Sequence, residues 1–303
     1  MAETAEPKRH LPKPDWLKIK PPGGERYTLI KNLADSNQLS TVCQEAKCPN
    51  MSECWGGGTA TFMLLGGTCT RGCRFCNVAT SKTGDLVDFD EPRKLANSIK
   101  IMKLDYAVIT MVDRDDLPDG GAQHVQDCLN EVKIQNPETL IEMLSGDFRG
   151  NMDQVRIVAE SKLEVFAHNI ETTRILTPKV RDPRCGYDQS LKILKMVKSE
   201  YPKLFTKSSI MVGLGETKED VIQTMKDLRD NDVDIVTLGQ YLQPTQKHLQ
   251  VQDFVHPEVF REYERIGHEL GFVYVASGPL VRSSYRAGEL LLKGKIAERQ
   301  SAF

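Results

Sequence analysis

The 303-residue sequence has no long hydrophobic run. Its longest apolar stretches, such as residues 106–112, are far shorter than the ~20 residues that a membrane-spanning helix needs. Residues 1–14 carry charges of both signs and three prolines without an apolar core, and they are not arginine-rich and acid-poor. We therefore expect neither a signal peptide nor an organelle transit peptide, and we predict a cytoplasmic protein without membrane contact.

Two further absences narrow the class of protein. The net charge is −2 and the charges are interspersed, so no basic stripe points to nucleic acid. No repeat of 20–50 residues and no low-complexity segment is present, which argues against solenoids and disordered linkers. With 40 % hydrophobic residues, the chain can instead bury the core of one large domain.

The secondary-structure pattern repeats along the chain. Six short apolar or β-branched runs without alternation are typical of buried parallel strands. They cover residues 62–67, 106–112, 139–144, 163–170, 208–213 and 234–241. Helical periodicity fills the intervals and predicts helices over residues 91–103, 121–134, 151–161, 187–201, 218–230 and 256–270.

Six strand-then-helix units in a row favour a parallel α/β fold. A complete eight-unit barrel typically needs ~250 residues, so we predict an open, partial (β/α)6 TIM-like barrel over residues 62–270. Residues 1–61 are rich in proline and are expected to form an N-terminal extension of irregular chain and short helices. Residues 271–303 would form a C-terminal segment outside the barrel, with a helix over 289–295.

Six of the eight cysteines form two groups of three between residues 43 and 76. Cys69, Cys73 and Cys76, with the spacing C-x3-C-x2-C, follow the first predicted strand. Three thiolates are one ligand too few to close a tetrahedral zinc site or a four-iron cluster. A metal centre here would therefore keep one position open, and it would lie at the barrel mouth, where parallel α/β barrels gather their functional groups.

Disulfides and zinc are the alternative interpretations of this cysteine-rich segment. Disulfides need an oxidising compartment, for which the N-terminal residues give no sign. Structural zinc sites usually combine two C-x2-C pairs, or one such pair with histidines. Only Cys73 and Cys76 form such a pair, and no histidine lies between Leu11 and Gln123, so an iron–sulfur centre explains the spacing better.

The triplet, with the aromatic Phe75 before its last cysteine, resembles the signature of the radical S-adenosylmethionine enzymes. This resemblance implies a four-iron cluster whose fourth iron is chelated by the amino and carboxylate groups of S-adenosylmethionine. It also implies a 5′-deoxyadenosyl radical that removes hydrogen from unactivated carbon. No side-chain acid or base has a pKa suited to that task, so no catalytic residue is expected beyond the cluster ligands.

The second set, Cys43, Cys48 and Cys54, has the spacing C-x4-C-x5-C. Together with residues 45–50 and the near-terminal Arg-Ser-Ser-Tyr motif at 282–285, this set resembles the lipoyl synthases, and the resemblance runs over most of the chain. Further matching stretches are Asp115–Ala122, His168–Thr172, Leu176–Arg181 and Gly213–Thr217.

The resemblance to lipoyl synthases implies a second, auxiliary four-iron cluster on Cys43, Cys48 and Cys54, with a serine oxygen of the terminal motif as its fourth ligand. We expect Ser284 to be that ligand, with Ser283 as the alternative. Serine is also a favoured helix N-cap, so one of the two could cap a helix instead. A serine binds iron more weakly than a thiolate, which suits a cluster that is consumed as a sulfur source.

Four residues are candidates for binding S-adenosylmethionine. Residues 207–216 resemble the adenine-binding element of the wider radical family, which implicates Gly213 and Glu216. Asn169 and Glu171 end the fourth predicted strand and could hydrogen-bond the ribose or the methionyl group. A tight strand-to-helix turn or ordinary loop capping would explain the same residues.

The lipoyl synthase resemblance implies a sulfurtransferase that inserts two sulfur atoms, at C6 and C8 of a protein-bound N6-octanoyl-lysine. It implies two molecules of S-adenosylmethionine and an external electron donor. The carriers would be the octanoylated lipoyl domains of 2-oxo acid dehydrogenase E2 subunits and the glycine cleavage H protein. Another radical sulfur transferase, or a non-catalytic electron carrier or cluster-assembly scaffold, are the alternatives.

The remaining features are local. Gln243, and Ser145 or Gly146, stand where members of the family often carry arginine and proline, which affects substrate contacts rather than the chemistry. Cys128 lies in a helical stripe and is interpreted as a packed core thiol. Cys185 follows Pro183 in a loop without a paired cysteine nearby, and we interpret it as incidental.

Overall fold

A large curved sheet organises the chain. The computed structural model describes residues 12–18, 23–36, 39–45, 50–56, 61–284, 294–296 and 298–299. The sheet has eight strands in the order β1-β2-β5-β6-β7-β8-β9-β10. They are β1 (Ser40–Thr41), β2 (Thr61–Leu64), β5 (Tyr106–Met111), β6 (Leu140–Leu144), β7 (Val165–Ala167), β8 (Phe205–Val212), β9 (Ile235–Gln240) and β10 (Tyr274–Gly278). All neighbouring strands are parallel except β1 and β2, which are antiparallel.

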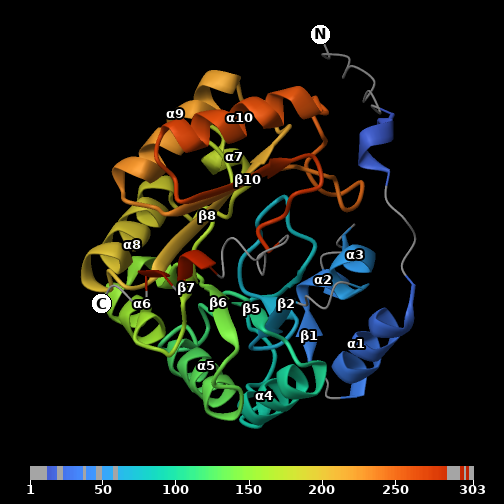
Figure 1. Cartoon of the computed structure of the whole chain (residues 1–303), viewed down its shortest axis with the longest axis vertical. Coiled ribbons are helices and arrows are strands. Elements are labelled where there is room, and N and C mark those ends of the chain that lie inside the picture. Colours follow the sequence, from blue (N-terminus) through green and yellow to red (C-terminus); the bar gives the residue numbers. More distant parts are fainter. Residues whose placement is uncertain are drawn as a thin grey trace.

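Helices cover the outer face of this sheet (Figure 1). Six of them alternate with the parallel strands: α4 (Glu91–Met102), α5 (Ala122–Gln135), α6 (Met152–Ala159), α8 (Tyr187–Glu200), α9 (Lys218–Asp230) and α10 (Pro257–Glu269). The other elements are η1 (Asp15–Leu17), α1 (Glu25–Ser36), α2 (Val42–Glu45), α3 (Met51–Gly56), η2 (Phe148–Gly150), α7 (Thr177–Val180) and the paired strands β3 (Thr68–Cys69) and β4 (Ala79–Thr80). Each predicted long helix is present, with bounds close to those expected. No helix in the described part of the chain is long and apolar enough to cross a membrane.

The parallel sheet extends one strand beyond the six predicted from the sequence. In β10, Val275 pairs with Val236 and Gly278 pairs with Gly239 of β9. The run Tyr-Val-Ala-Ser-Gly is short and ends in small residues, so it lacks the apolar signature of a buried strand. The segment after residue 270 therefore first adds β10 to the edge of the sheet, and the described residues after β10 lie outside it. The helix expected over 289–295 lies mostly outside the described residues.

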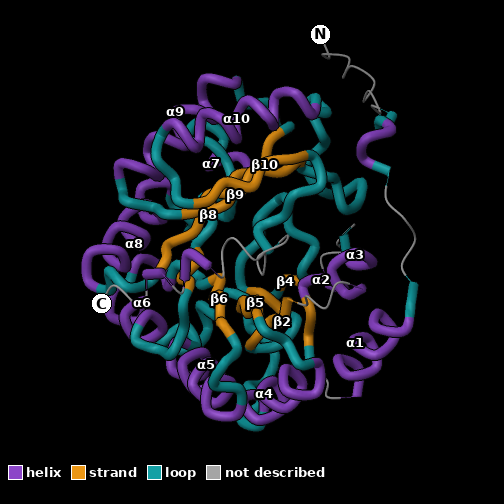
Figure 2. The backbone as a smooth tube through the Cα atoms, in the orientation of Figure 1, coloured by secondary structure: helices purple, strands orange, loops and turns teal. Residues whose placement is uncertain are grey.

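The sheet curls into an open barrel, as predicted. Figure 2 shows the strands curving around a central space, and β1 and β10 are its two edges. The end of the barrel where the strands begin is filled by apolar side chains. Tyr106, Val165, Phe205 and Ile235, the first residues of four strands, form a buried cluster with Ile296 of the C-terminal segment. The barrel is thus closed at that end, and its functional end is the opposite one.

Candidate functional site

A cavity of about 530 Å³ opens inside the barrel. Its walls are largely apolar and include Met63, Val108, Leu144 and Met211. The predicted site residues among its lining are Cys43, Cys69, Cys73, Cys76, Asn169, Glu171, Ser283 and Ser284. Residues more than 200 positions apart in the sequence therefore meet at one site.

The loop that carries the C-x3-C-x2-C triplet has a fixed entry. After β2 ends, Leu65 takes a left-handed backbone conformation with φ 68°, and Gly66 follows with φ 91°. The Leu65 N–H donates to Glu91 Oε2 at 3.1 Å, and the Gly67 N–H donates to Asp85 Oδ2 at 2.7 Å. These two carboxylates hold the sharp turn, and the residues that follow it include the three cysteines that line the cavity.

Glu91 is itself held by a partly buried partner on the neighbouring helix. His124 Nε2 lies 2.7 Å from Glu91 Oε2, the same oxygen that accepts from Leu65. Cys128 of α5 completes a group whose ligand atoms all lie within 4.8 Å of one another. Cys128 is fully buried among core residues, in agreement with its interpretation as a packed thiol. The pair of Glu91 and His124 thus supports the start of the cysteine loop from α4 and α5.

Each cysteine of the triplet accepts a backbone hydrogen bond at sulfur. The Arg71 N–H donates to Cys69 Sγ at 3.4 Å, and the Asp182 N–H donates to Cys73 Sγ at 3.4 Å. A backbone hydrogen bond from Val78 lowers the pKa of Cys76, although burial raises it more. Burial also raises the pKa of Cys69 to about 11. Burial therefore favours the protonated thiols, and binding of a cationic centre would favour the thiolates.

The donor set fits an iron–sulfur cluster. Three cysteines on one loop face a shared cavity, and N–H donors are already directed at their sulfur atoms, an arrangement that tunes such clusters. Three cysteines leave one coordination position of such a cluster open, and polar groups from other strands, such as Asn169, line the same cavity. The described cysteines form no disulfide with one another.

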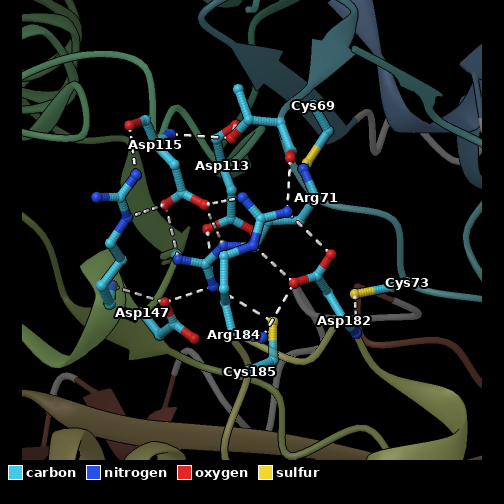
Figure 3. Close-up of polar contacts among 12 residues, drawn as sticks. Cys69, Arg71, Cys73, Asp113, Asp115, Asp147, Asp182, Arg184 and Cys185 are labelled. Carbon is cyan, nitrogen blue, oxygen red and sulfur yellow. Dashed lines mark hydrogen bonds and ion pairs between the residues drawn. The ribbon is translucent and has the colours of Figure 1, made fainter. Parts of the chain in front are cut away.

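A lattice of ion pairs, in which Arg71 is buried and Arg184 is exposed, surrounds the cysteine loop (Figure 3). Arg71 binds Asp115 through Nε at 3.0 Å and through its second terminal nitrogen at 2.9 Å. Arg184 contacts both Asp115 and Asp182 at 2.8 Å. Asp182 in turn accepts from the Gly72 N–H at 2.8 Å. The lattice joins the cysteine loop to the loops after β5 and α7, so the loop is fixed from several sides.

The ion-pair lattice was not predicted from the sequence, although Asp115 begins one of the stretches, Asp115–Ala122, that resemble the lipoyl synthases. Arg71 lies between two predicted cluster ligands, and its exposed fraction is 2 %. The one sequence signal that could have suggested the lattice is an arginine between two cysteines of a metal-binding loop, since such an arginine needs carboxylate partners if it is buried. The identity of those partners depends on contacts between distant loops.

Asn169 and Glu171 lie at the cavity as predicted. Asn169 donates through Nδ2 to Glu171 Oε1 at 3.1 Å, while its Oδ1 is buried without a hydrogen-bond partner. Burial raises the pKa of Glu171, and this residue has a left-handed backbone with φ 68°. An unpaired buried acceptor beside a strained carboxylate is typical of a site that binds a polar ligand. This geometry fits the amino or hydroxyl groups of S-adenosylmethionine.

Gly213 and Glu216 are not part of the cavity lining. Glu216 accepts from the backbone N–H groups of Gly213 and of Leu214, the latter at 3.0 Å, and so closes its own loop. Gly213 has φ 94°, and a Cβ there would lie 2.1 Å from Gln240 Nε2. The structure thus explains both residues by the turn after β8, and cofactor contact by them stays a prediction.

The residues of the predicted auxiliary cluster are partly visible. Cys43 of α2 lines the cavity and is buried, whereas Cys54 of α3 packs against the main core. Cys48 lies outside the described residues, as does the last residue of the Arg-Ser-Ser-Tyr motif. Ser283 and Ser284 reach the cavity from the other end of the chain.

One contact brings the two ends of the chain together at this point: the Asn50 amide donates to the backbone carbonyl of Leu280. A second contact anchors the C-terminal segment to β9, where Arg282 donates to the carbonyl of Gln240 at 3.2 Å. A third contact joins the extension to the cysteine loop, where the Asn77 amide donates to the carbonyl of Glu45 at 2.7 Å. The N-terminal extension and the C-terminal segment are therefore both anchored beside the triplet.

His168 is a buried member of the cavity wall. Its Nδ1 lies 2.9 Å from the carbonyl of Ser145 and its Nε2 lies 2.9 Å from Ser190 Oγ. Burial lowers the pKa of His168 to about 4, so the ring is neutral near pH 7. His168 follows directly after β7 and is therefore a polar group at the end of a strand.

Comparisons with known proteins agree with this geometry. Residues 63–228 match the family model of the radical SAM superfamily. The lipoyl synthase of an Anaeromyxobacter strain is 55 % identical over 287 residues, which cover 95 % of this chain and 97 % of that protein. The mitochondrial lipoyl synthases of Culex quinquefasciatus and Homo sapiens are 56 % and 52 % identical, over 95 % of this chain and 77 % and 79 % of theirs.

Solved structures share the fold at low sequence identity. Methylornithine synthase (PylB) is 11 % identical with a TM-score of 0.53, covering 91 % of this chain and 87 % of that one. The maturase HydG from Carboxydothermus hydrogenoformans is 12 % identical with a TM-score of 0.55, covering 81 % and 67 %. These similarities confirm the partial barrel. The family match and the sequence relatives show that this chain belongs to the lipoyl synthase family of radical SAM enzymes, which implies a four-iron cluster and S-adenosylmethionine.

Proposed function

We propose that this protein inserts two sulfur atoms, at C6 and C8 of an octanoyl chain attached to a lysine of a carrier protein. The carriers would be lipoyl domains of 2-oxo acid dehydrogenase E2 subunits and the glycine cleavage H protein. One observation carries the proposal: the cysteine triplet, Cys43 and the two serines of the terminal motif line the same cavity. A sulfur source and the triplet would then share access to one substrate.

The cavity wall is suited to an aliphatic chain. Met63, Val108, Leu144 and Met211 present apolar surface around a volume of about 530 Å³, which is within the range of small-molecule sites. An acyl-lysine arm can enter such a cavity while its carrier stays outside. The few polar groups, among them Asn169 and Glu171, would then be available to the cofactor rather than to the chain.

The residues of this chain would bind and orient the reacting groups. Cys69, Cys73 and Cys76 would hold one cluster, which with S-adenosylmethionine supplies one-electron chemistry able to remove hydrogen from unactivated carbon. The Asn169 Oδ1 atom would accept a hydrogen bond from the cofactor, because it is buried without another partner. The closed far end of the barrel would exclude water from that side.

The auxiliary set would hold the sulfur source. We propose Cys43, Cys48, Cys54 and Ser284 as its ligands, with two four-iron clusters per chain in total. Cys43 and Ser284 line the cavity from opposite ends of the chain, which supports a shared site. The proposal also requires an external electron donor, since no described group of the protein supplies electrons for reductive cleavage.

An assay on an octanoyl-lysine peptide tests the function. The reconstituted protein, incubated without oxygen with S-adenosylmethionine and dithionite, should convert the peptide into a product that carries two additional sulfur atoms, detected by mass spectrometry. Cys54→Ala should still release 5′-deoxyadenosine but form no such product, whereas the control Cys128→Ala should behave as the wild type. A peptide that gains no sulfur despite full iron loading would refute the proposed function.

A further inference from the structure

Cys185 lies against one of the predicted cluster ligands. The two thiols are close enough to influence each other electrostatically, although the residues are more than 100 positions apart. Figure 3 shows both residues beside the ion-pair lattice. The sequence has no cysteine near Cys185, so this pairing arises from the fold alone.

Short contacts fix the two thiols relative to each other. The Cys185 N–H donates to the carbonyl of Asp182 at 2.8 Å, and the Asp182 N–H donates to Cys73 Sγ at 3.4 Å. One turn of the chain, residues 182–185, therefore contacts Cys73 and also carries Cys185. Arg71 donates through a terminal nitrogen to Cys185 Sγ at 3.3 Å and thereby orients it from the other side.

Both sulfur atoms are accessible to a small molecule. Cys73 and Cys185 are each part of the lining of the central cavity, although only 7 % of Cys185 is exposed. A disulfide needs its sulfur atoms to approach to about 2.0 Å, and the turn 182–185, which contacts Cys73 and carries Cys185, holds the two side chains on the same side of the cavity. The cavity admits a small oxidant, whereas the bulk of a protein oxidoreductase would stay outside.

We propose that Cys73 and Cys185 form a reversible disulfide in the cluster-free protein, with peroxide as the oxidant. In the first step, one thiol is oxidised by hydrogen peroxide to a sulfenic acid, and one water is released. In the second step, the other thiol attacks that sulfur, forms the S–S bond and releases a second water. Two thiols are thus oxidised by two electrons, and one peroxide is reduced to two waters.

The disulfide would act on cluster assembly. It withholds Cys73 from iron, so an oxidised chain cannot complete the triplet; this consequence rests on the proposed ligand role of Cys73. It also protects that sulfur from irreversible oxidation to the sulfinic acid, because a disulfide can be reduced again by thiols. Once iron binds Cys73, the partner of Cys185 is no longer available.

Peptide mapping tests the pairing directly. Trypsin separates Cys73, Cys76 and Cys185 into the peptides 72–74, 75–82 and 185–192. The cluster-free protein, treated with an equimolar amount of hydrogen peroxide and then blocked with iodoacetamide, should yield peptide 72–74 linked to peptide 185–192. Dithiothreitol should separate the two peptides and restore the iron loading of the untreated protein.

Variants distinguish this pairing from general thiol oxidation. After the same peroxide treatment and without dithiothreitol, Cys185→Ala should load several times more iron than the wild type, whereas Cys128→Ala should be as impaired as the wild type. A link between peptides 72–74 and 75–82 in place of the predicted one would overturn the proposal. So would equal yields of the predicted link before and after iron loading. These readouts do not depend on sulfur insertion. The disulfide can therefore be found in a protein that inserts no sulfur, and a protein that inserts sulfur can lack the disulfide.

Discussion

Arg71 and Asp147 form an ion pair at 2.5 Å in which both side chains are 1 % exposed. The same guanidinium binds Asp115 with two nitrogen atoms. Arg71 belongs to the cysteine loop, whereas Asp115 and Asp147 follow β5 and β6. One arginine therefore holds three loops of the barrel mouth together.

We predict that Arg71→Gln destabilises the cluster-free protein by about 3–5 kcal/mol, because it leaves the buried Asp147 carboxylate without its counter-charge. Arg71→Lys should cost less, since it keeps the charge but loses the two-nitrogen contact. The free energy of unfolding in urea measures both effects. Arg93→Gln, which removes an exposed ion pair with Asp90, is the control and should leave the midpoint unchanged. A midpoint of Arg71→Gln equal to that of the control would contradict the bridging role.

The second prediction concerns acid stability and His168. Burial lowers its pKa in the folded protein to about 4, while an unfolded histidine titrates near 6.5. Nearby Arg181 also lowers this pKa, whereas Asp147 raises it. Between these two pKa values the unfolded chain binds a proton that the folded chain does not. The stabilisation that His168 provides is therefore complete above pH ~6.5 and is lost as pH falls towards ~4.

His168→Gln removes this titration and keeps a side chain able to hydrogen-bond Ser145 and Ser190. Its free energy of unfolding should depend less on pH than that of the wild type, by up to about 1.4 kcal/mol per pH unit between pH ~6.5 and ~4. Urea unfolding at a series of pH values across this interval measures the difference. Parallel curves for the two proteins would mean that His168 is protonated in the folded state.

The fold could be predicted closely from the sequence because its signals are local. Helix α9 carries its capping residue Thr217 and its apolar stripe within one segment, and it occupies the predicted range. Strands such as β5 are runs of apolar and β-branched residues. Strand β10 is different: its run is short, and it is a strand because β9 offers it an edge to pair with.

The site could be predicted only in part, for a related reason. The spacing of Cys69, Cys73 and Cys76 is a local property that indicates a metal site directly. By contrast, the partners of Arg71 and the contact between Cys73 and Cys185 depend on how loops after different strands meet. Gly213 is absent from the cavity lining for the same reason: residues distant in the sequence, Gln240 and Asp253, occupy the space beside it.

The third prediction tests how the C-terminal segment reaches the cavity. A Cβ at Gly239 would lie 2.0 Å from the backbone carbonyl oxygen of Val281, and a backbone atom cannot move aside on its own. Gly239→Ala should therefore displace the segment that carries Ser283 and Ser284 and lower iron loading from about eight to about four atoms per chain. Gly294→Ala, where a Cβ meets nothing within 4 Å, is the control. Unchanged loading of Gly239→Ala would show that the segment can shift without losing the site.

The fourth prediction distinguishes the two serines of the terminal motif, both of which line the cavity. Only one oxygen is needed to complete a four-iron cluster that already has three cysteine ligands. We expect Ser284→Ala to lose the auxiliary cluster and sulfur insertion, and to keep the cleavage of S-adenosylmethionine, because Cys69, Cys73 and Cys76 are untouched. Ser283→Ala should keep both clusters. Iron and sulfide content per chain, together with the release of 5′-deoxyadenosine, separates these outcomes. If Ser283→Ala loses about four irons and Ser284→Ala does not, Ser283 is the ligand instead, and loss in neither variant would remove serine from the ligand set.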